Sequence, residues 1–285
     1  MRVILAGGGT GGHVFPAISI ADEIKSRDQG NEVLFIGSRK GLESELVPGS
    51  GYEIKYVRAS GIKGLGPLKS AMGALIASKG VTESLMILRS YKPDCVIGVG
   101  GYVSGPLVLA ASILRIPTAV CEQNTVPGVT NRILGRFVNR VFATFEESKV
   151  YFPGRKVVVT GNPIRPQFLI DRKQAHDRDG YTILVFGGSQ GAGTLNRVLP
   201  EAFEIISRKD IRIIHQTGKA DCKEVASASK IRGIKAEVVT FIDDMASAYQ
   251  SSDLVISRSG AGTIAELTAL GKPSVPCEGN TKIDI

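Results

Sequence analysis

Two glycine-rich segments constrain the fold of this chain more than any other feature, because each stands between a short apolar run and a helical pattern. The first is Gly7-Gly8-Gly9-Thr10-Gly11-Gly12-His13, and the second is Gly187-Gly188-Ser189-Gln190-Gly191-Ala192. Glycine lets the backbone adopt positive φ and approach an anion closely, and the helix that follows offers unpaired N–H groups. Loops of this kind at matching places in two halves predict two α/β domains that bind phosphate-bearing ligands.

Short apolar runs alternate with helical patterns along the chain, and this alternation predicts parallel sheets built from βα units. In the first half we expect strands at Arg2–Ala6, Glu32–Ile36, Glu53–Val57, Asp94–Gly98, Thr118–Cys121, Val141–Ala143 and Val157–Thr160. The helices expected between them are Val14–Ser26, Pro67–Ser90, Ser104–Leu114 and Gly128–Leu134.

The second half repeats this organisation. The expected strands are Thr182–Phe186, Ile211–Gln216, Glu237–Phe241, Leu254–Ser257 and Ser274–Pro276, and the expected helices are Thr194–Ser207, Ala220–Ser227, Met245–Gln250 and Gly262–Leu270. A turn signal at Gly161-Asn162-Pro163, in a chain of 285 residues, predicts two domains, 1–163 and 164–285. We expect two Rossmann-like domains that face a common cleft.

The composition excludes several classes of protein. The chain has no Trp and 6% aromatic residues, so we expect no nucleic-acid partner. Its four cysteines form no C-x-x-C pair, which favours buried thiols in a reducing compartment over a metal or redox site. No run reaches the roughly 18 apolar residues of a membrane-spanning helix, and the apolar start resembles a buried strand more than a signal peptide. Of the net charge of +8, residues 1–160 carry +7, which indicates an anionic partner or solubility charge.

The first glycine loop carries a possible proton acceptor. Gly7, Gly9 and Gly12 match G-x-G-x-x-G, but a dinucleotide site also needs an acid at the end of the second strand. That strand is followed by Gly37-Ser38-Arg39-Lys40, which disfavours NAD and leaves NADP as a minority alternative. His13 stands at a helix N-terminus, where the dipole keeps the imidazole neutral and able to act as a base. A capping or packing histidine is the structural alternative.

A third segment, Ser257-Arg258-Ser259-Gly260-Ala261-Gly262-Thr263-Ile264-Ala265-Glu266, also joins a strand to a helix. Its small residues let a diphosphate reach the helix N-terminus, and Arg258 adds positive charge. Glu266 is suited to the vicinal hydroxyls of a ribose, or it is a first-turn acid that complements the helix dipole.

Other polar and apolar groups allow two interpretations each. Asp243 and Asp244 resemble a metal pair, but adjacent side chains point in different directions, so a helix N-cap is favoured and no metal site is expected. Gln123 and Asn124 follow a strand and are suited to sugar hydroxyls, although loop amides are commonly just solvated. One apolar helical stripe fits a membrane-surface patch or, more commonly, a core-facing helix; it consists of Leu68, Met72, Leu75 and Ile76 beside Lys63, Lys69 and Lys79.

Taken together, these segments resemble the bacterial peptidoglycan N-acetylglucosaminyltransferases of the MurG family, which convert lipid I to lipid II. The matching segments occur in family order from residue 3 to about 273: GGGTGGHVFP, GVGGYVSGP, EQNTVPG, GNPIR, GGSQGA, FIDDMASAY and SRSGAGTIAEL. The resemblance implies the GT-B architecture and an inverting hexosyltransferase without a metal or other cofactor. Its donor would be UDP-N-acetylglucosamine and its acceptor the undecaprenyl-diphosphate muropeptide lipid I.

The resemblance also implies a location and a set of site residues. The protein would be peripheral on the cytoplasmic face of the cell membrane, with a basic, apolar face of the first domain against the anionic inner leaflet. His13 would be the candidate base, Glu266 would hold the ribose, and the Ile242 backbone would meet the uracil. With Arg258 added from the third segment, the substrate-binding residues are Thr10, Gly11, Gly12, Asn124, Arg165, Ser189, Ile242, Arg258, Ala261, Gly262, Thr263, Ile264, Ala265 and Glu266.

The last residues depart from the family pattern. After Gly271-Lys272-Pro273 the family continues through a strand, a D-x-x-Q-like sugar-binding loop and several helices, whereas this chain reads 274–285 as SVPCEGNTKIDI. The pattern predicts an incomplete second domain, truncated or frameshifted near residue 277, with apolar sheet surface left exposed. The alternative function is a catalytically inactive fragment that retains only UDP or anionic-lipid binding.

Overall fold

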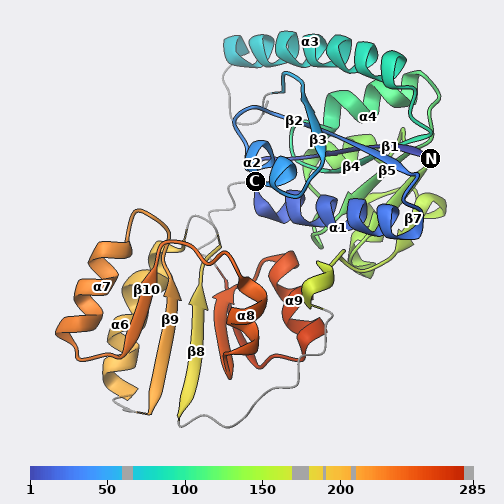
Figure 1. The fold of residues 1–285 in the computed structure, drawn as a ribbon. Helices are drawn as coiled ribbons and strands as arrows, with labels where there is room; N and C mark the ends of the chain where they lie inside the picture. The colour runs from blue at the N-terminus through green and yellow to red at the C-terminus, as the bar shows by residue number, and fades with distance from the viewer. Residues whose placement is uncertain (60–66, 169–179, 189–190, 207–209, 279–285) are drawn as a thin grey trace. The chain divides into compact units, whose positions relative to one another are not determined.

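The chain divides into two compact units, Met1–Arg165 and Pro166–Ile285, in the computed structural model (Figure 1). The structure describes residues 1–59, 67–168, 180–188, 191–206 and 210–278, and within the helix at 67–91 it describes side chains from Lys79 onward. Each unit has its own parallel sheet and its own hydrophobic core.

The first unit is built on a seven-stranded parallel sheet in the order β3-β2-β1-β4-β5-β6-β7. The strand order reverses between β1 and β4, and in sheets of this kind ligands bind beyond the carboxyl ends of the strands at that point. The strands are β1 (Arg2–Gly7), β2 (Glu32–Gly37), β3 (Glu53–Tyr56), β4 (Cys95–Gly100), β5 (Thr118–Glu122), β6 (Arg140–Ala143) and β7 (Val157–Val159).

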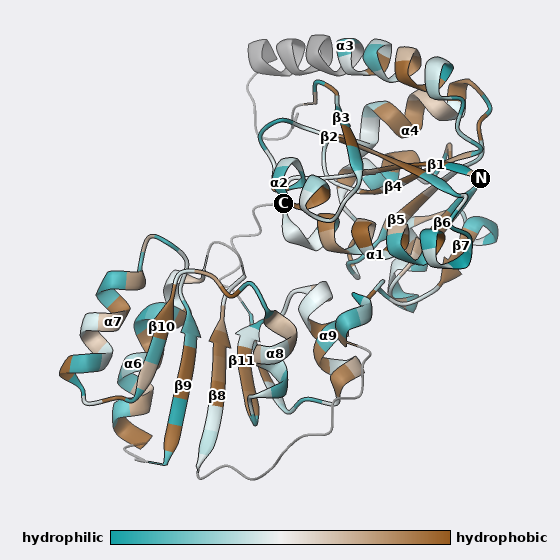
Figure 2. Ribbon diagram, in the orientation of Figure 1, coloured by the Kyte–Doolittle hydropathy of each residue, from teal (hydrophilic) through white to brown (hydrophobic). Residues whose placement is uncertain are grey.

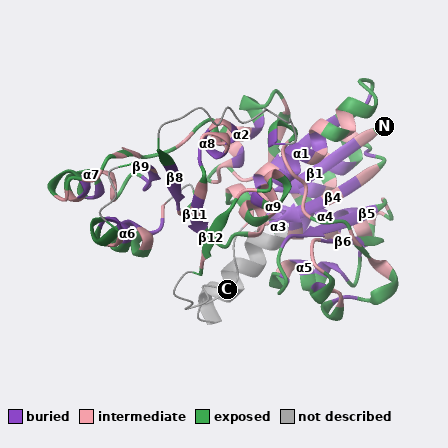
Figure 3. Cartoon of the chain, turned by 90° about the horizontal axis from the view of Figure 1, so that it is seen from below, coloured by how far each residue is buried: buried purple, intermediate pink, exposed green. Residues whose placement is uncertain are grey.

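Helices cover both faces of this sheet, with α1 on one side and α3 and α4 on the other (Figure 1). Side chains alternate along a strand, so Val3 and Leu5 of β1 pack toward α1, whereas Ile4 and Ala6 pack toward α3 and α4. The strand is therefore buried on both faces (Figure 3), which explains its continuous apolar sequence. The helices are α1 (Gly11–Arg27), α2 (Glu43–Gly49), α3 (Pro67–Tyr91), α4 (Ser104–Ile113) and α5 (Val129–Leu134), with 3-10 helices η1 (Glu146–Tyr151) and η2 (Gly154–Lys156).

The second unit is built on a five-stranded parallel sheet in the order β10-β9-β8-β11-β12. Its core joins β8 and β9 to α6 through Ile183, Val185, Leu199, Phe203 and Ile213, and β8 is hydrophobic over most of its length in Figure 2. Its elements are η3 (Pro166–Phe168), β8 (Tyr181–Phe186), α6 (Gly193–Ile206), β9 (Ile211–Gln216), α7 (Cys222–Ile231), β10 (Ala236–Val239), α8 (Met245–Gln250), β11 (Leu254–Arg258), α9 (Ala261–Leu270) and β12 (Ser274–Cys277).

The predicted fold class, two parallel-sheet α/β units, is confirmed, and each predicted strand and helix has a counterpart. Two differences matter for the site. Helix α1 begins at Gly11 and not at Val14, so His13 lies inside its first turn. The short helix α2 is not predicted, because its sequence ESELVPG contains Pro48 and ends in glycine. None of the described helices is long and apolar enough to cross a membrane.

Candidate active site

The first glycine loop joins the end of β1 to the start of α1. Thr10 is the N-cap residue, and its carbonyl accepts hydrogen bonds from the N–H groups of His13 (3.1 Å) and Val14 (3.2 Å). The N–H groups of Gly11 and Gly12 belong to the first helical turn, which has no acceptors for them within the helix. The loop therefore offers backbone donors and the positive end of the helix dipole at the switch point of the sheet.

A buried carboxylate holds this loop from behind. Glu43, from α2, is fully buried, and its Oε2 accepts a hydrogen bond of 2.8 Å from the Gly9 N–H. Its Oε1 accepts from the N–H and the hydroxyl of Ser38, both at 2.8 Å. A Cβ at Gly8, at Gly37 or at Gly41 would overlap the Glu43 side chain, so these glycines form its cage. Burial acts to raise the pKa of Glu43, but the hydrogen bonds from Gly9 and Ser38 outweigh it and hold the pKa below 4.5.

The imidazole of His13 packs against the end of β4. Gly100 has φ of +124°, and a Cβ there would lie 2.3 Å from His13 Cδ2 and 2.7 Å from Nε2, so a glycine is required for the ring to fit. Thr10 Oγ1 lies 3.5 Å from Nδ1. Burial lowers the pKa of His13 below 6.5; a hydrogen bond with the Gly8 backbone and the carboxylates of Glu122 and Glu43 act in the opposite direction. This shift favours the neutral ring at pH 7. Its largest cause is burial, whereas the sequence analysis expected the helix dipole to keep the imidazole neutral.

A second buried carboxylate organises the loop after β5. Glu122 Oε1 accepts hydrogen bonds from the Asn124 N–H (2.9 Å) and the Asn124 side-chain amide (3.1 Å). Its Oε2 accepts from the Asn131 amide at 2.9 Å. These hydrogen bonds fix the orientation of Asn124, which is exposed. Gln123 is buried, and its side-chain amide donates to the Val99 carbonyl at 2.9 Å. Of the two amides suggested for sugar hydroxyls, the structure exposes only that of Asn124.

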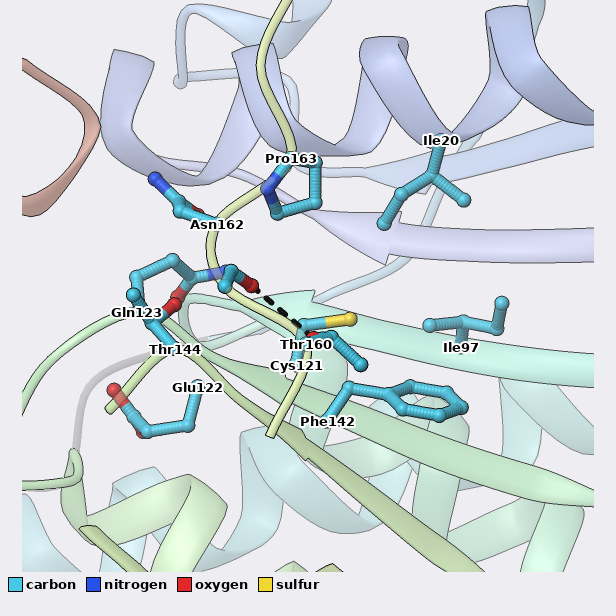
Figure 4. A pocket seen from close by; sticks show the side chains of 11 residues that line it. Ile20, Ile97, Cys121, Glu122, Gln123, Phe142, Thr144, Thr160, Asn162 and Pro163 are labelled. Atoms are coloured by element: carbon cyan, nitrogen blue, oxygen red, sulfur yellow. Dashed lines mark hydrogen bonds between the residues drawn. The ribbon is translucent and has the colours of Figure 1, made fainter. Parts of the chain in front are cut away.

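A small pocket of about 170 Å³ lies near these groups, at the carboxyl ends of β5 and β6 (Figure 4). Ile97, Cys121 and Phe142 form its apolar side, and Gln123 and Asn162 contribute polar atoms. Gln123, suggested from the sequence for sugar hydroxyls, thus lines it, whereas none of the substrate-binding residues implied by the family resemblance does. Arg165 lies elsewhere on this unit, with its guanidinium 4.4 Å from the centre of the Phe15 ring, so it stacks on the first helix.

The second glycine loop is held by a buried glutamine. Gln216, at the end of β9, donates to the Gly188 carbonyl (2.9 Å) and accepts from the Ile242 N–H (2.8 Å). It therefore joins the loop after β8 to the loop after β10, where the sequence places the base contact. Ser189 lies outside the described residues.

The loop is also closed against the end of β9 at Gly191. This residue has φ of +80°, and a Cβ there would lie 1.8 Å from the Thr217 carbonyl oxygen. The Asn196 amide donates to that same oxygen at 2.9 Å and to Asp221 at 2.7 Å. His215 lies 3.1 Å from Asn196 Oδ1, and burial lowers its pKa to about 4, so this network contains a neutral histidine.

The third segment places a carboxylate near a helix N-terminus. Helix α9 begins at Ala261 after the N-cap residue Gly260, and Arg258, at the end of β11, is exposed. The buried hydroxyl of Tyr249 donates to Glu266 Oε2 at 3.1 Å. Tyr249 packs against the rings of Phe168 and Phe186, with centroids 5.6 and 5.9 Å away. The predicted residues 261–266 thus lie in the first turns of one helix, and the hydrogen bond from buried Tyr249 fixes the orientation of the Glu266 carboxylate.

One further prediction has a definite outcome. Asp244 is the N-cap of α8 and accepts from the Ser247 N–H at 3.0 Å, which confirms the N-cap interpretation. Within the described residues, no group of three or more His, Cys, Asp or Glu side chains is arranged to hold a metal ion. The apolar stripe Leu68–Ile76 with Lys63 and Lys69 lies outside the described side chains.

Sequence reasoning missed the side chains that hold the loops. Glu43 and Gln216 form hydrogen bonds to the backbone of the two glycine loops, and Tyr249 forms one to the Glu266 carboxylate. A signal for Glu43 does exist, because this acid follows the second strand, two positions after Gly41 and close to the place where a dinucleotide site has an acid. Gln216 and Tyr249 carry no such signal, since each reads as part of an ordinary strand or helix.

Comparison with known proteins places both units in one family. Residues 3–143 match the glycosyltransferase family 28 N-terminal domain, and residues 182–280 match the glycosyltransferase family 28 C-terminal domain. The chain is similar to the UDP-N-acetylglucosamine–N-acetylmuramyl-(pentapeptide) pyrophosphoryl-undecaprenol N-acetylglucosamine transferase of Syntrophus aciditrophicus, at 46% identity over 96% of this chain and 77% of that protein. The enzyme of the same name from Myxococcus xanthus is 46% identical over 96% of this chain and 73% of its own length.

Solved structures agree with this placement. The crystal structure of Acinetobacter baumannii MurG superposes with a TM-score of 0.73 at 33% identity, covering 99% of this chain and 79% of that one. UDP-GlcNAc 2-epimerase from Neisseria meningitidis, at 16% identity and a TM-score of 0.69 over 99% of this chain and 84% of its own, shares the fold alone. The chain belongs to glycosyltransferase family 28 and, within it, to the MurG family of N-acetylglucosaminyltransferases.

Proposed function

We propose that this chain transfers N-acetylglucosamine from UDP-N-acetylglucosamine to the undecaprenyl-diphosphate muropeptide lipid I, which yields lipid II. The observation that carries the proposal is a similarity to the named transferases that spans both units, at 46% identity over 96% of the chain. Each unit also contributes a glycine-rich junction of strand and helix inside the matched residues.

In the proposed reaction an acceptor hydroxyl oxygen attacks the anomeric carbon of N-acetylglucosamine on the side opposite UDP. The new C–O bond forms while the bond to the β-phosphate oxygen breaks, the configuration inverts, and UDP leaves with the electron pair. The hydroxyl proton passes to neutral His13, whose lowered pKa suits a base at neutral pH. The N-terminus of α9 and Arg258 stabilise the charge that develops on UDP.

The remaining predicted residues divide between the two substrates. In the first unit, the backbone N–H groups at Thr10–Gly12 bind diphosphate, and Asn124 and Arg165 contact the donor. In the second unit, Glu266 holds the ribose hydroxyls and the Ile242 backbone meets the uracil. The diphosphate of the donor lies against Ser189, Ala261, Gly262, Thr263, Ile264 and Ala265.

The direct test is transfer of radiolabelled N-acetylglucosamine from UDP-N-acetylglucosamine to a lipid I analogue. We expect a labelled lipid II product and release of UDP in equal amounts. UDP binding without transfer by a folded sample would contradict the proposed activity.

We further propose that the first unit works at the anionic cytoplasmic face of the cell membrane. The segment from α5 onward exposes Val129, Ile133 and Phe137, four residues apart, with exposed fractions of 50%, 54% and 55%. Arg132 and Arg136 lie between them in the sequence, so apolar and basic side chains alternate along one segment. This combination supports shallow insertion with electrostatic attraction to anionic lipid.

Replacing Ile133 and Phe137 with Ser should weaken binding to phosphatidylglycerol-containing vesicles by about 10- to 100-fold, because each side chain loses part of the roughly 1.5–3 kcal/mol of full burial. Vesicle co-sedimentation measures the change. The matched control is Ile231→Ser, since Ile231 is an equally apolar and 83% exposed residue of α7 in the second unit. Equal losses in both variants, or none in either, would contradict the assignment of this segment.

The hydroxyl of Tyr249 should contribute to UDP binding through Glu266. Tyr249→Phe keeps the packing against Phe168 and Phe186 but removes the hydrogen bond that fixes Glu266 Oε2. We expect the Kd for UDP, measured by calorimetry, to rise about 3- to 10-fold, as for the loss of one hydrogen bond. Tyr181→Phe, which removes an exposed hydroxyl from β8, is the control and should leave the Kd unchanged.

A further inference from the structure

One peptide group of the first glycine loop lies between a buried carboxylate and the proposed base. The Gly9 N–H donates to Glu43 Oε2 at 2.8 Å. The structure contains no cis peptide bond in its described residues, and in a trans peptide the N–H and the preceding C=O point in opposite directions. The Gly8 carbonyl therefore points away from Glu43.

The imidazole of His13 lies on the side to which that carbonyl points. Gly101 packs so closely that a Cβ there would lie 2.4 Å from the Gly8 oxygen, and a Cβ on the adjacent Gly100 would lie 2.7 Å from His13 Nε2. The Gly8 oxygen and His13 Nε2 thus both pack against the two adjacent glycines at the end of β4. Nδ1 faces the other way, toward the Thr10 hydroxyl at 3.5 Å.

We propose that Glu43 is a positioning residue for His13, acting through the Gly8–Gly9 peptide: the carboxylate fixes the peptide, its carbonyl accepts the Nε2–H, and Nδ1 is left with the lone pair. The inference rests on the proposed function only for the use of that lone pair as a base. The orientation of the ring and its tautomer follow from the loop alone.

The cage around Glu43 explains why a carboxylate is needed there. Both oxygens accept from backbone N–H groups, one from Gly9 and the other from Ser38, so two acceptors are required. A glutamine has one acceptor oxygen, and in either orientation its NH₂ group faces an N–H donor. Glu43→Gln therefore disturbs the peptide without changing the size of the side chain.

The charged groups that act on His13 are Glu43 from α2 and Glu122 from the end of β5, and both favour the protonated ring. Removing the charge of Glu43 should move the acid limb of kcat/KM to lower pH, because His13 then stays neutral in more acidic solution. It should also lower kcat about 10- to 100-fold through misorientation, with the KM for UDP-N-acetylglucosamine little changed. A merely structural role would not move the acid limb.

The experiment is ¹⁵N NMR of the full chain labelled at its three histidines, with the His13 signals assigned from a His13→Gln sample. We expect the Nε2–H tautomer in the unmodified chain and a mixture of tautomers in Glu43→Gln. Glu45→Gln, on the exposed face of the same helix, is the control and should match the unmodified chain. Ser38→Ala, which removes one of the hydrogen bonds to Glu43, should give a smaller change in the same direction and serves if Glu43→Gln does not fold.

Unchanged His13 signals in both Glu43→Gln and Ser38→Ala would overturn the inference. That outcome is independent of the proposed function, because the tautomer is read without substrate. If the chain shows the expected tautomers but transfers no sugar, the positioning of His13 stands and the proposed activity fails.

Discussion

His13→Gln is expected to lower kcat for N-acetylglucosamine transfer by about 10²- to 10⁴-fold, the range typical of losing a general base. Glutamine keeps a polar side chain of similar reach but cannot accept the proton of an attacking hydroxyl at neutral pH. The steady-state transfer assay gives kcat, and calorimetry with UDP gives the affinity of the second unit. The affinity for UDP should stay the same, because none of the contacts proposed for UDP is made by the His13 side chain.

The pH dependence of the unmodified chain provides a second check on His13. Burial lowers its pKa below 6.5, so the ring is neutral, and active as a base, at all pH values above that lowered pKa. The acid limb of kcat/KM should therefore lie below pH 6.5, and it should disappear in His13→Gln. A kcat within a few-fold of normal in His13→Gln, with an unchanged acid limb, would assign the proton transfer to another group.

The fold was predictable because its physical causes are local. The run RVILAG of β1 is apolar on both faces, which is typical of a central parallel strand, and the glycines after it mark the turn into α1. The sequence did not predict α2, because its seven residues include Pro48 and two charged side chains. Its residue Glu43 is held by buried hydrogen bonds from Gly9 and Ser38, and contacts between such separate segments leave no periodic pattern in the sequence.

The site was predictable to a lesser extent. Glycine-rich loops and the Glu266 segment are visible as motifs because backbone approach requires small residues at fixed spacings. Gln216 acts through hydrogen bonds to residues 28 and 26 positions away, and Tyr249 acts through a hydrogen bond to a residue 17 positions away. Such pairs have no characteristic spacing in the sequence. The partners of Gln216 become identifiable only when the strand order brings β8, β9 and β10 side by side, and the partner of Tyr249 lies on another helix, α9.

Gly191→Ala is expected to destabilise the second unit by about 2–5 kcal/mol, through backbone strain and overlap together. Alanine at φ of +80° costs about 1–2 kcal/mol in backbone strain alone. The added Cβ would also lie 1.8 Å from the Thr217 carbonyl oxygen, so one of the two chain segments must move. Overpacking of this kind costs about 1–3 kcal/mol more. Urea denaturation followed by circular dichroism measures the loss.

The Thr217 carbonyl cannot move cheaply, because the Asn196 amide holds it at 2.9 Å and Asn196 is itself bound to Asp221 and to buried His215. Gly233→Ala is a control that separates the cost of backbone strain from the cost of steric overlap. Gly233, in the same unit, also has a positive φ, +66°, but a Cβ there would meet nothing within 4 Å. We expect this control to lose only the strain, about 1–2 kcal/mol. Equal losses in the two variants would mean that the loop yields freely at Gly191, and the Asn196 network could then not be what fixes the second glycine loop for a diphosphate.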